Sequence, residues 1–518
     1  METTARDASQ ADGRWRAAIA GLGLAIAALV GLCGPGRIDI VDGQTRYEVA
    51  RSLHDHGDLE IRDPRVTFAV FPGRDGKRYT TYRLPQSLLG VGAIVVSDAT
   101  GPTSEVRRRF FFSLLGAFEA GLIAVLFAVA FRRRGMSRRA ALGWAALGAL
   151  ATPVWFYATS TFDDEIGAAV LVGMFVVAER FAGSQRVAGA LAVGLLAGLA
   201  FHAKPPLAVF LLPALARLAP PAWRRPGWLR SWLVGALACG ALVALHFALE
   251  RYLFPPSARA LHPALIAKYV PTWLGDPFAA FSGWLMSPGA GFLWYCPPAA
   301  LALAGFVRRS RSDRDYARAM FFAVAIYLAF LAKLTFWKGD PCWGPRYLTP
   351  LFAIGWLSVP EGSRSLGKLV ASLLIAAGVV VQLLALAIDP HRLFVARDLH
   401  ATYYAEDQFV YLHPEVSHLL ARPGEIAAAW SERDRPAPRF SPAPDPTFAF
   451  PMLNDLQRGP ATVERFTVLR TFRPWWWAMR ELPPAERPVG LATTGLTLVA
   501  CLAGALAALS WSARLGDP

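Results

Sequence analysis

Long apolar runs separated by short arginine-rich loops restrict the fold of this sequence more than any other feature. The chain has 518 residues, of which 54% are hydrophobic and only 18% are charged. Runs of about 20 apolar residues match the thickness of a bilayer core, where a helix satisfies its own backbone hydrogen bonds. The pattern therefore predicts an all-α polytopic membrane protein and excludes a soluble enzyme with one large core.

The arginine-rich loops also predict the orientation of the chain. The formal net charge is +15, and short loops such as RRRGMSRR carry much of it, as is typical of the cytoplasmic side of a membrane. The charge is therefore no reason to expect a nucleic-acid partner. Alternation of basic and non-basic loops predicts about twelve spans with both termini in the cytoplasm. The expected spans are 15–34, 110–131, 140–158, 166–181, 188–201, one ending near 218, 231–249, 292–307, 319–336, one ending at 359, 369–388 and 489–511.

These spans divide the chain into three parts. Residues 1–388 are expected to form a transmembrane catalytic module, with a first long loop at 35–108 on the non-cytoplasmic side. Residues 389–488 are a proline-rich segment expected on the same side, and 489–518 hold the last span and a cytoplasmic tail. The first apolar run has no small-residue cleavage site and is interpreted as a retained span. The five cysteines show neither a disulfide framework nor metal-ligand spacing.

The first long loop begins with an acidic segment, Gly36–Ala50, of sequence GRIDIVDGQTRYEVA. Apolar residues recur at helical spacing from Tyr47 to Leu53, which predicts an amphipathic helix along the bilayer surface. A second apolar stretch at 86–96 is too short to cross and is also expected at the surface. Asp39 and Asp42 would thus be held at the membrane surface, where a carboxylate suits proton abstraction from a hydroxyl. The alternative for Asp42 is an N-cap of the helix.

Other charged residues are expected on the same face of the membrane, in short turns between spans. We name one of these turns, Ser160–Glu165, the acidic turn. Carboxylates can act as a base or orient a donor or acceptor, whereas lysine and arginine can neutralise a phosphate. Such a mixed site at the bilayer surface suits a donor with a lipid phosphate. The candidates are Asp163, Asp164, Glu165, Lys204, Lys338 and Arg346.

Each of these charges also has a structural interpretation. Charged turns keep a membrane protein's loops hydrated, and acids at a helix N-terminus are favoured by the helix dipole. Lys204 at a helix end is compatible with a side chain that reaches towards water. Glu119 lies in the middle of a predicted span, where a carboxyl group is costly without a partner, and a structural hydrogen bond is the expected role.

Several motifs together resemble bacterial glycosyltransferases of the GT-C class. They are the acidic first loop, TFDDE in the acidic turn, the Lys-Pro turn of HAKPP, SPGAGFLWYCPP and WGPRYLTP. The nearest group is family 39 and its relatives, which include protein O-mannosyltransferases and lipid A aminoarabinose transferases. The resemblance covers about residues 15–390.

The resemblance implies a polyprenyl-phosphate-linked sugar donor, a lipid, glycan or protein acceptor, and inversion at the sugar carbon. It makes Asp42 the general base, with Asp39 as a competitor because Gly43 follows Asp42 where many members have glutamate. It makes Glu165 an acid that orients donor or acceptor, or holds a divalent cation where members use one. No other cofactor is implied. The expected location is the bacterial cytoplasmic membrane, with a periplasmic or extracellular active face.

Alternative functions remain open at this point. A surface-glycan polymerase or ligase with a pyrophosphate-linked donor would share the spans and basic residues but would not require the first-loop aspartate. A transporter or flippase of lipid-linked sugars would show repeats and intramembrane ionisable pairs. A non-catalytic scaffold would tolerate loss of every acid on the outer face. The sequence has no glycine-rich phosphate loop, which agrees with a donor that carries no nucleotide.

Overall fold

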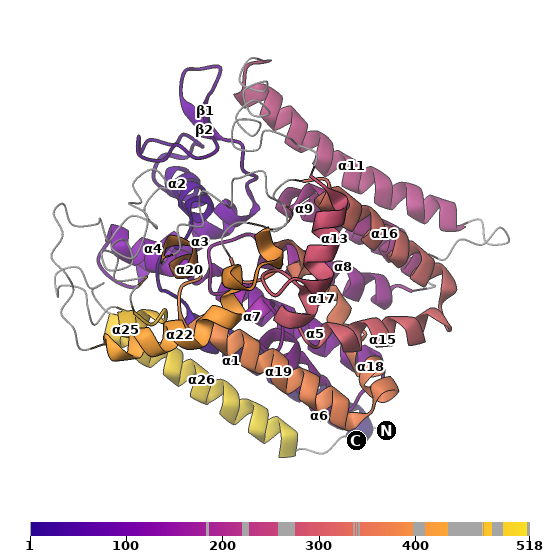
Figure 1. Ribbon diagram of the computed structural model, residues 1–518. Coiled ribbons are helices and arrows are strands. Elements are labelled where there is room, and N and C mark those ends of the chain that lie inside the picture. Colours follow the sequence, from indigo (N-terminus) through magenta and orange to yellow (C-terminus); the bar gives the residue numbers. More distant parts are fainter. Residues whose placement is uncertain are drawn as a thin grey trace.

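The chain is mostly helical in the computed structural model (Figure 1). The structure describes residues 2–182, 186–219, 227–256, 275–334, 337, 339, 342–396, 410–433, 469, 471–478 and 491–514. Within these residues, the strands are β1 (Val70–Pro72) and β2 (Arg78–Thr80), which form a short antiparallel pair. The predicted helical class is therefore confirmed.

In the described part of the chain, 5 helices are long and apolar enough to cross a membrane. They lie in α1 (Glu2–Cys33), in α4 (Glu105–Ser113) continued by α5 (Leu115–Arg133), and in α11 (Gly227–Leu253), α16 (Arg314–Ala332) and α19 (Lys368–Ala387). Shorter apolar helices are α9 (Val187–Ala203), η1 (Pro205–Phe210) with α10 (Leu211–Leu218), and part of α26 (Leu491–Arg514). The protein is thus a multi-pass membrane protein, while the expected number of spans stays a prediction.

Some predicted spans are broken helices. The span expected at 140–158 consists of α6 (Arg138–Leu150) and α7 (Val154–Tyr157), and the one at 292–307 of α14 (Phe292–Tyr295) and α15 (Ala299–Ser310). Pro153 precedes α7, and Pro297 and Pro298 separate α14 from α15; proline lacks the amide hydrogen that a continuous helix needs. The span expected to end at 359 contains α17 (Thr349–Trp356), and α18 (Val359–Leu366) begins where that span was expected to end.

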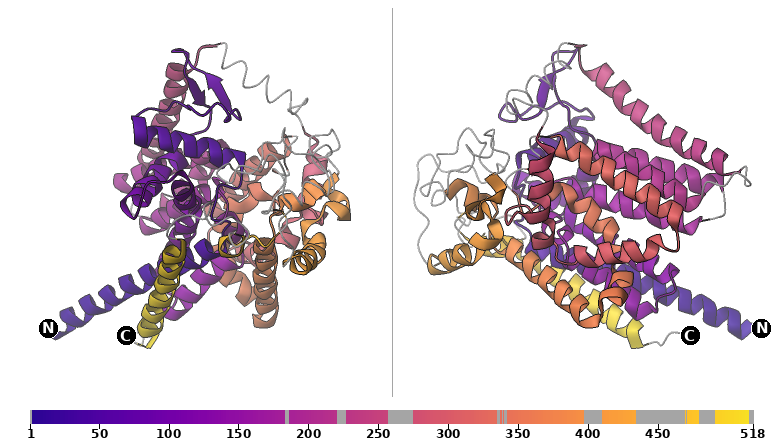
Figure 2. Two further views of the ribbon diagram at one scale, coloured as in Figure 1. Left: turned by 90° about the vertical axis from the view of Figure 1, so that its left-hand side faces the viewer. Right: turned by 45° about the vertical axis from the view of Figure 1, so that its right-hand side comes forward.

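The N-terminal end of α1 and the C-terminal end of α26 lie at one end of the helix bundle. Helices α1 and α26 run antiparallel, because Gly21 faces Ala508 and Gly31 faces Leu498. Figures 1 and 2 show the described ends of α1 and α26 on the same side of the molecule. The opposite end, where α1 and α9 end and α8 (Asp164–Arg180) begins, carries the first long loop; we call it the loop end. This placement agrees with the prediction that the termini share one side.

Small residues allow the membrane helices to approach closely. Gly194 of α9 lies against the backbone of Gly235 in α11, and Gly121 of α5 lies against the backbone of Gly23 in α1. Packing of this kind is typical of helices in membranes, where apolar side chains gain little by leaving lipid. It holds α9, which ends next to the predicted site residue Lys204, against α11.

The first long loop folds into α2 (Val41–His56), the β1–β2 pair, α3 (Pro85–Ala99) and the start of α4. α2 forms where a surface helix was expected, but it is buried under its neighbours: Tyr47 and Ala50 have no exposed surface, and Tyr47 packs edge-on against Phe112 at 5.4 Å between ring centroids. The N-cap of α2 is Ile40, so the interpretation of Asp42 as an N-cap is wrong. α3, by contrast, exposes an apolar face, as the sequence predicted for this stretch, through Leu88, Leu89, Val95 and Val96.

The described parts of the predicted segment 389–488 pack on the loop end of the bundle. They contain α20 (His391–Ala396), α22 (His418–Ser431) and α25 (Trp475–Ala478). The Trp475 indole donates a hydrogen bond of 3.0 Å to the carbonyl of Gly31, near the end of α1. The remaining short helices are α13 (Pro277–Met286), η2 (Arg346–Leu348), η3 (Val410–Leu412) and η4 (Pro414–Val416).

Candidate functional site

Asp42 lies in the first turn of α2 and is oriented by the loop before α3. The Tyr82 hydroxyl donates a hydrogen bond of 2.5 Å to Oδ1 of Asp42. One turn further along α2, the Arg46 guanidinium packs over the Tyr82 ring, 4.5 Å from its centroid. Tyr82 therefore contacts both charged side chains and sets the direction of the Asp42 carboxylate.

Arg46 connects the first long loop to the acidic turn. Its Nη2 atom lies 2.7 Å from Oδ2 of Asp163, the residue that precedes α8. Burial acts to raise the pKa of Asp163, but the cationic Arg46 and Lys204 outweigh it, and the pKa lies below its ordinary value. Burial acts to lower the pKa of Arg46, but the carboxylates of Asp163 and Asp42 outweigh it and raise the pKa. Both groups are therefore charged at neutral pH.

Asp164 is fully buried and joins the two basic residues predicted to bind phosphate. The Lys204 ammonium forms a short ion pair with Oδ1 of Asp164 and lies 4.0 Å from Oδ1 of Asp163. Nε of Arg346 lies 3.7 Å from Oδ2 of Asp164. The two cations thus meet at one carboxylate, as the prediction of a shared site requires.

Local structure explains how both basic residues reach this point. Lys204 follows the last residue of α9, because Pro205 and Pro206 cannot continue that helix. Arg346 begins η2, and its guanidinium packs over the Phe162 ring, 4.0 Å from the centroid. Aromatic rings next to a guanidinium stabilise its charge and restrict its orientation.

Tyr347 contacts both cations. Nη2 of Arg346 donates a hydrogen bond of 3.1 Å to the Tyr347 hydroxyl, and the Lys204 ammonium lies 4.9 Å from the ring centroid. The aromatic ring and Asp164 therefore hold Lys204 and Arg346 close to each other in a buried setting, where electrostatic interactions are stronger than in water.

Glu165 is fully buried in the first turn of α8, and its carboxylate oxygens have no hydrogen-bond partner among the described residues. The carboxylate of Glu119 in α5 is likewise buried and has no hydrogen-bond partner in the described structure. Glu119 was expected to make a structural hydrogen bond, but its side chain makes none among the described residues. An unpaired buried carboxylate is costly in its charged form. The expected orienting role of Glu165 stays a prediction.

Asp39 has a different environment from Asp42. Its Oδ1 atom accepts hydrogen bonds of 2.9 Å from the backbone N and from Oγ1 of Thr161, and Oδ2 lies 3.1 Å from Nη2 of Arg473. Both oxygens of this buried carboxylate therefore accept hydrogen bonds from other residues of the protein. This arrangement supports the acidic turn, and the choice between Asp39 and Asp42 as the base stays a prediction.

The structure brings most of the predicted residues together and adds others. Lys338 lies outside the described residues. Ion pairs link Asp163, Asp164, Lys204 and Arg346 directly. Asp42 joins them through Tyr82 and Arg46, and Asp39 joins the acidic turn through Thr161. Sequence analysis missed Arg46, although its position four residues after Asp42 on one helix is a usable signal. It also missed Tyr82 and Arg83, for which no spacing rule applies; Arg83 packs over the Phe201 ring at 5.3 Å.

Among the described residues, no group of three or more His, Cys, Asp or Glu side chains could hold a metal ion. Asp163 and Asp164 face Arg46, Lys204 and Arg346. Carboxylates neutralised in this way form a setting for an anion rather than for a divalent cation.

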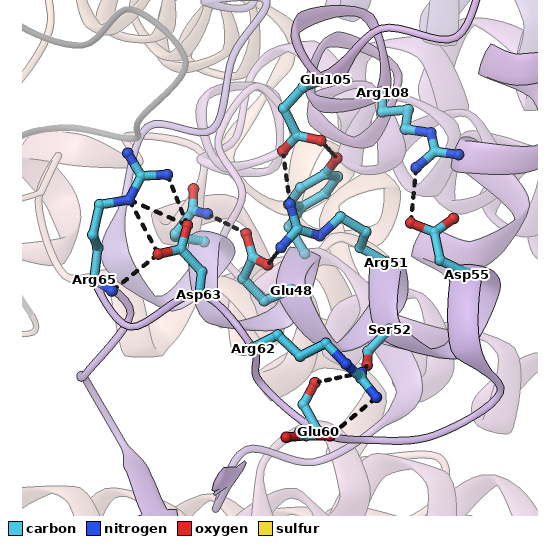
Figure 3. Close-up of polar contacts among 12 residues, drawn as sticks. Glu48, Arg51, Ser52, Asp55, Glu60, Arg62, Asp63, Arg65, Glu105 and Arg108 are labelled. Atoms are coloured by element: carbon cyan, nitrogen blue, oxygen red, sulfur yellow. Dashed lines mark hydrogen bonds and ion pairs between the residues drawn. The ribbon is translucent and has the colours of Figure 1, made fainter.

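A second polar site lies beside α2, close to Glu48 (Figure 3). We call it the charged bowl; its volume is about 210 Å³, and Glu48, Arg51, Ser52, Asp55, His56, Glu60, Arg62, Glu105 and Arg108 line it. Ion pairs cross-link it, including Arg51–Glu48 at 2.5 Å and Arg108–Asp55 at 3.0 Å. Burial raises the pKa of Glu48 to about 7, although Arg51 and Arg109 oppose the shift. The ion pair between Arg108 of α4 and Asp55 of α2 therefore holds these two helices together.

No protein-family model and no curated protein matches the sequence. Among solved structures, the chain is similar to ArnT from Cupriavidus metallidurans bound to undecaprenyl phosphate, with 17% identity, a TM-score of 0.48, and coverage of 92% of this chain and 87% of ArnT. It is also similar to the archaeal oligosaccharyltransferase AglB from Archaeoglobus fulgidus in complex with an inhibitory peptide and a dolichol-phosphate. That match has 15% identity and a TM-score of 0.39, and covers 83% of this chain and 61% of AglB. The similarities extend over most of the chain, as the sequence resemblance predicted. At these values they do not identify a donor, an acceptor or a reaction.

Proposed function

We propose that the protein is a membrane glycosyltransferase that moves a sugar from a polyprenyl-phosphate donor to a hydroxyl of a lipid, glycan or protein acceptor. One observation carries this proposal: an oriented carboxylate, Asp42, belongs to the same cluster as two cations that meet at Asp164. The cluster lies where α9 ends and α8 begins, at the loop end of the bundle. A donor with its tail in the membrane can place its phosphate at such a boundary.

Lys204 and Arg346 are the proposed phosphate-binding residues. Lysine offers three donors and arginine five, so each can keep its contact with Asp164 and still bind a phosphate oxygen. Arg346 can also bind two oxygens at once. Arg83 is a further candidate, because its Nε atom is buried without a hydrogen-bond partner among the described residues. Lys338 remains a candidate from the sequence alone.

Asp42 is the proposed general base. As the acceptor oxygen bonds to the anomeric carbon, its proton passes to Asp42 and the bond from that carbon to the phosphate oxygen breaks. The electron pair of that bond leaves with the polyprenyl phosphate, whose charge Lys204 and Arg346 stabilise. Attack opposite the leaving group inverts the anomeric carbon. Tyr82 keeps the base oriented.

The other acids have supporting roles in this proposal. Asp163 and Asp164 orient Arg46, Lys204 and Arg346 through the ion pairs described above. Glu165, which follows Asp164 in the chain, is proposed to help orient the donor or the acceptor. No step of the proposed reaction requires a metal ion. Asp39 is assigned to positioning, because both of its oxygens already accept hydrogen bonds from the protein.

Purified protein in lipid nanodiscs, given synthetic donors and a cell-envelope extract as acceptor source, tests the proposal. Mass spectrometry would follow release of polyprenyl phosphate from a monophosphate-linked sugar, with a pyrophosphate-linked sugar in parallel. We expect release from the monophosphate donor alone, and its loss in Asp42→Asn. Turnover of the pyrophosphate donor by parent and Asp42→Asn alike would support a polymerase or ligase instead. Movement of intact donor across proteoliposomes would support a transporter.

A further inference from the structure

Arg473 is a buried arginine in the C-terminal part of the chain, two residues before α25. Only 3% of its surface is exposed. Its backbone N donates a hydrogen bond of 2.9 Å to the carbonyl of Ala387, the last residue of α19. The guanidinium lies over the Phe156 ring, with its Cζ atom 4.9 Å from the ring centroid. Arg473 is thus anchored at its backbone before its side chain reaches the acidic turn.

The Arg473 side chain joins two segments that are far apart in the sequence. Its Nη2 atom donates to Oδ2 of Asp39 at 3.1 Å and to the carbonyl of Thr159 at 3.2 Å. Its Nη1 atom forms a short hydrogen bond with Oγ1 of Thr159. Asp39 in turn accepts both hydrogen bonds from Thr161. One guanidinium therefore ties the residues before α2 to the residues before α8.

We propose that Arg473 is a positioning residue that fixes the distance between Asp42 and the Asp163–Asp164 pair. This inference rests on the proposed function. Asp39 lies three residues before Asp42, and Thr161 lies two residues before Asp163. Asp39 and Thr161 lie outside regular helix or strand, so the contacts of Asp39 and Arg473 hold them in place.

The chemistry of arginine explains why this position carries a guanidinium. The acceptors belong to two segments, and a planar group with five donors can serve them together, whereas an ammonium presents a point charge. The Nη1 and Nη2 atoms of Arg473 are paired and restrict the arrangement of the two segments, while its Nε atom has no hydrogen-bond partner among the described residues. Arg473 itself makes no described contact with Asp42, Lys204 or Arg346, so it acts through Asp39 and Thr159.

This role predicts a separation of turnover from donor binding. Lys204 and Arg346 are held by Asp164 and Tyr347, and loss of Arg473 leaves those contacts in place. Displacement of Asp42 by about 1 Å, however, lowers turnover by about 100-fold. A residue that merely stabilises the fold would lower the amount of folded protein without changing kcat per folded molecule.

Arg473→Gln and Arg473→Lys, compared with Arg392→Lys, test the inference. Arg392 is also buried and donates a hydrogen bond of 3.1 Å to the carbonyl of Leu469 in the same part of the chain. Hydrogen–deuterium exchange of residues 37–42 and 158–163 would be measured together with kcat and the Kd for polyprenyl phosphate. In Arg473→Gln we expect faster exchange in both segments and a fall in kcat of tenfold or more, with the Kd within about twofold. Arg473→Lys should lie between Arg473→Gln and the parent, and Arg392→Lys should resemble the parent.

The outcomes separate this inference from the proposed function. Unchanged exchange in both segments, in a folded Arg473→Gln protein, overturns the positioning role whatever the activity. Faster exchange with parental kcat overturns it as well. If Arg473→Gln does not fold, the same measurements are made on Asp39→Asn, which weakens the Arg473–Asp39 ion pair. The same results then support or overturn the positioning role. A parent that binds no polyprenyl phosphate and transfers no sugar refutes the proposed function, while the exchange data still decide whether Arg473 links the two segments.

Discussion

Gly43 of α2 lies directly against Thr161 of the acidic turn. A Cβ atom on Gly43 would overlap both Oγ1 and Cβ of Thr161. The first long loop and the acidic turn therefore approach each other at a point where no side chain fits. This contact explains why a glycine follows Asp42.

Gly43→Ala should separate these two segments. Overpacking of this kind typically costs about 1–3 kcal/mol, and we expect lower thermal stability together with at least tenfold slower sugar transfer. Gly92→Ala in α3 is the matched control, because nothing lies within 4 Å of a Cβ at that position. It should be neutral or stabilising by about 1 kcal/mol. Equal melting temperatures and activities in the two variants would contradict the close contact.

Asp42→Asn keeps the size of the side chain but cannot accept the proton. General-base catalysis contributes roughly 10²–10⁴-fold, so turnover should fall by that order while the affinity for polyprenyl phosphate is unchanged. Asp39→Asn should have a smaller effect on turnover. The measurement is the single-turnover rate of purified protein, with donor binding recorded in parallel. A larger loss in Asp39→Asn would remove Asp42 from the role of base.

Lys204→Ala and Arg346→Ala should weaken donor binding more than they alter acceptor preference. A hydrogen bond to a charged group contributes about 1.5–3 kcal/mol, so each variant should raise the Kd for polyprenyl phosphate by tenfold or more. Lys77→Ala is the control, since Lys77 lies in the first long loop and pairs with Asp58 and Glu60. Parental affinity in both Lys204→Ala and Arg346→Ala would refute the assignment.

Reporter fusions can test the expected topology. The sequence predicts that Arg134 is cytoplasmic and that the segment containing Arg433 is outside. Fusions truncated after Arg134 and after Arg433 should report opposite sides of the membrane. The same side for both would rule out a shared outer face for the candidate site and the C-terminal segment.

Glu48 should make the stability of the protein depend on pH. Burial raises its pKa in the folded protein to about 7, above the ordinary value of 4.5. The folded state therefore binds the proton more tightly, and the free energy of unfolding falls as the pH rises from 4.5 to 7, by about 3 kcal/mol at most. Glu48→Gln should flatten this part of the profile of melting temperature against pH. An unchanged profile in Glu48→Gln would contradict this role.

The sequence by itself determined the helical membrane class and the approximate positions of the longest apolar helices. These features depend on local composition, because each membrane helix must satisfy its own backbone and match the bilayer thickness. The sequence also indicated that α2 would be a helix and that acids would gather in short turns. Apolar periodicity and charge in the neighbouring residues are enough for such conclusions.

Only the tertiary structure decided which charged residues meet. Asp39 and Asp42 look alike in the sequence, yet Asp39 pairs with Arg473, 434 residues away, whereas Asp42 accepts a hydrogen bond from Tyr82. Lys204 follows α9 and Arg346 begins η2, and the two meet because both contact Asp164 and Tyr347. The physical reason is that the partner of a buried charge is set by how distant helices and loops pack, and no local pattern in the chain records that packing.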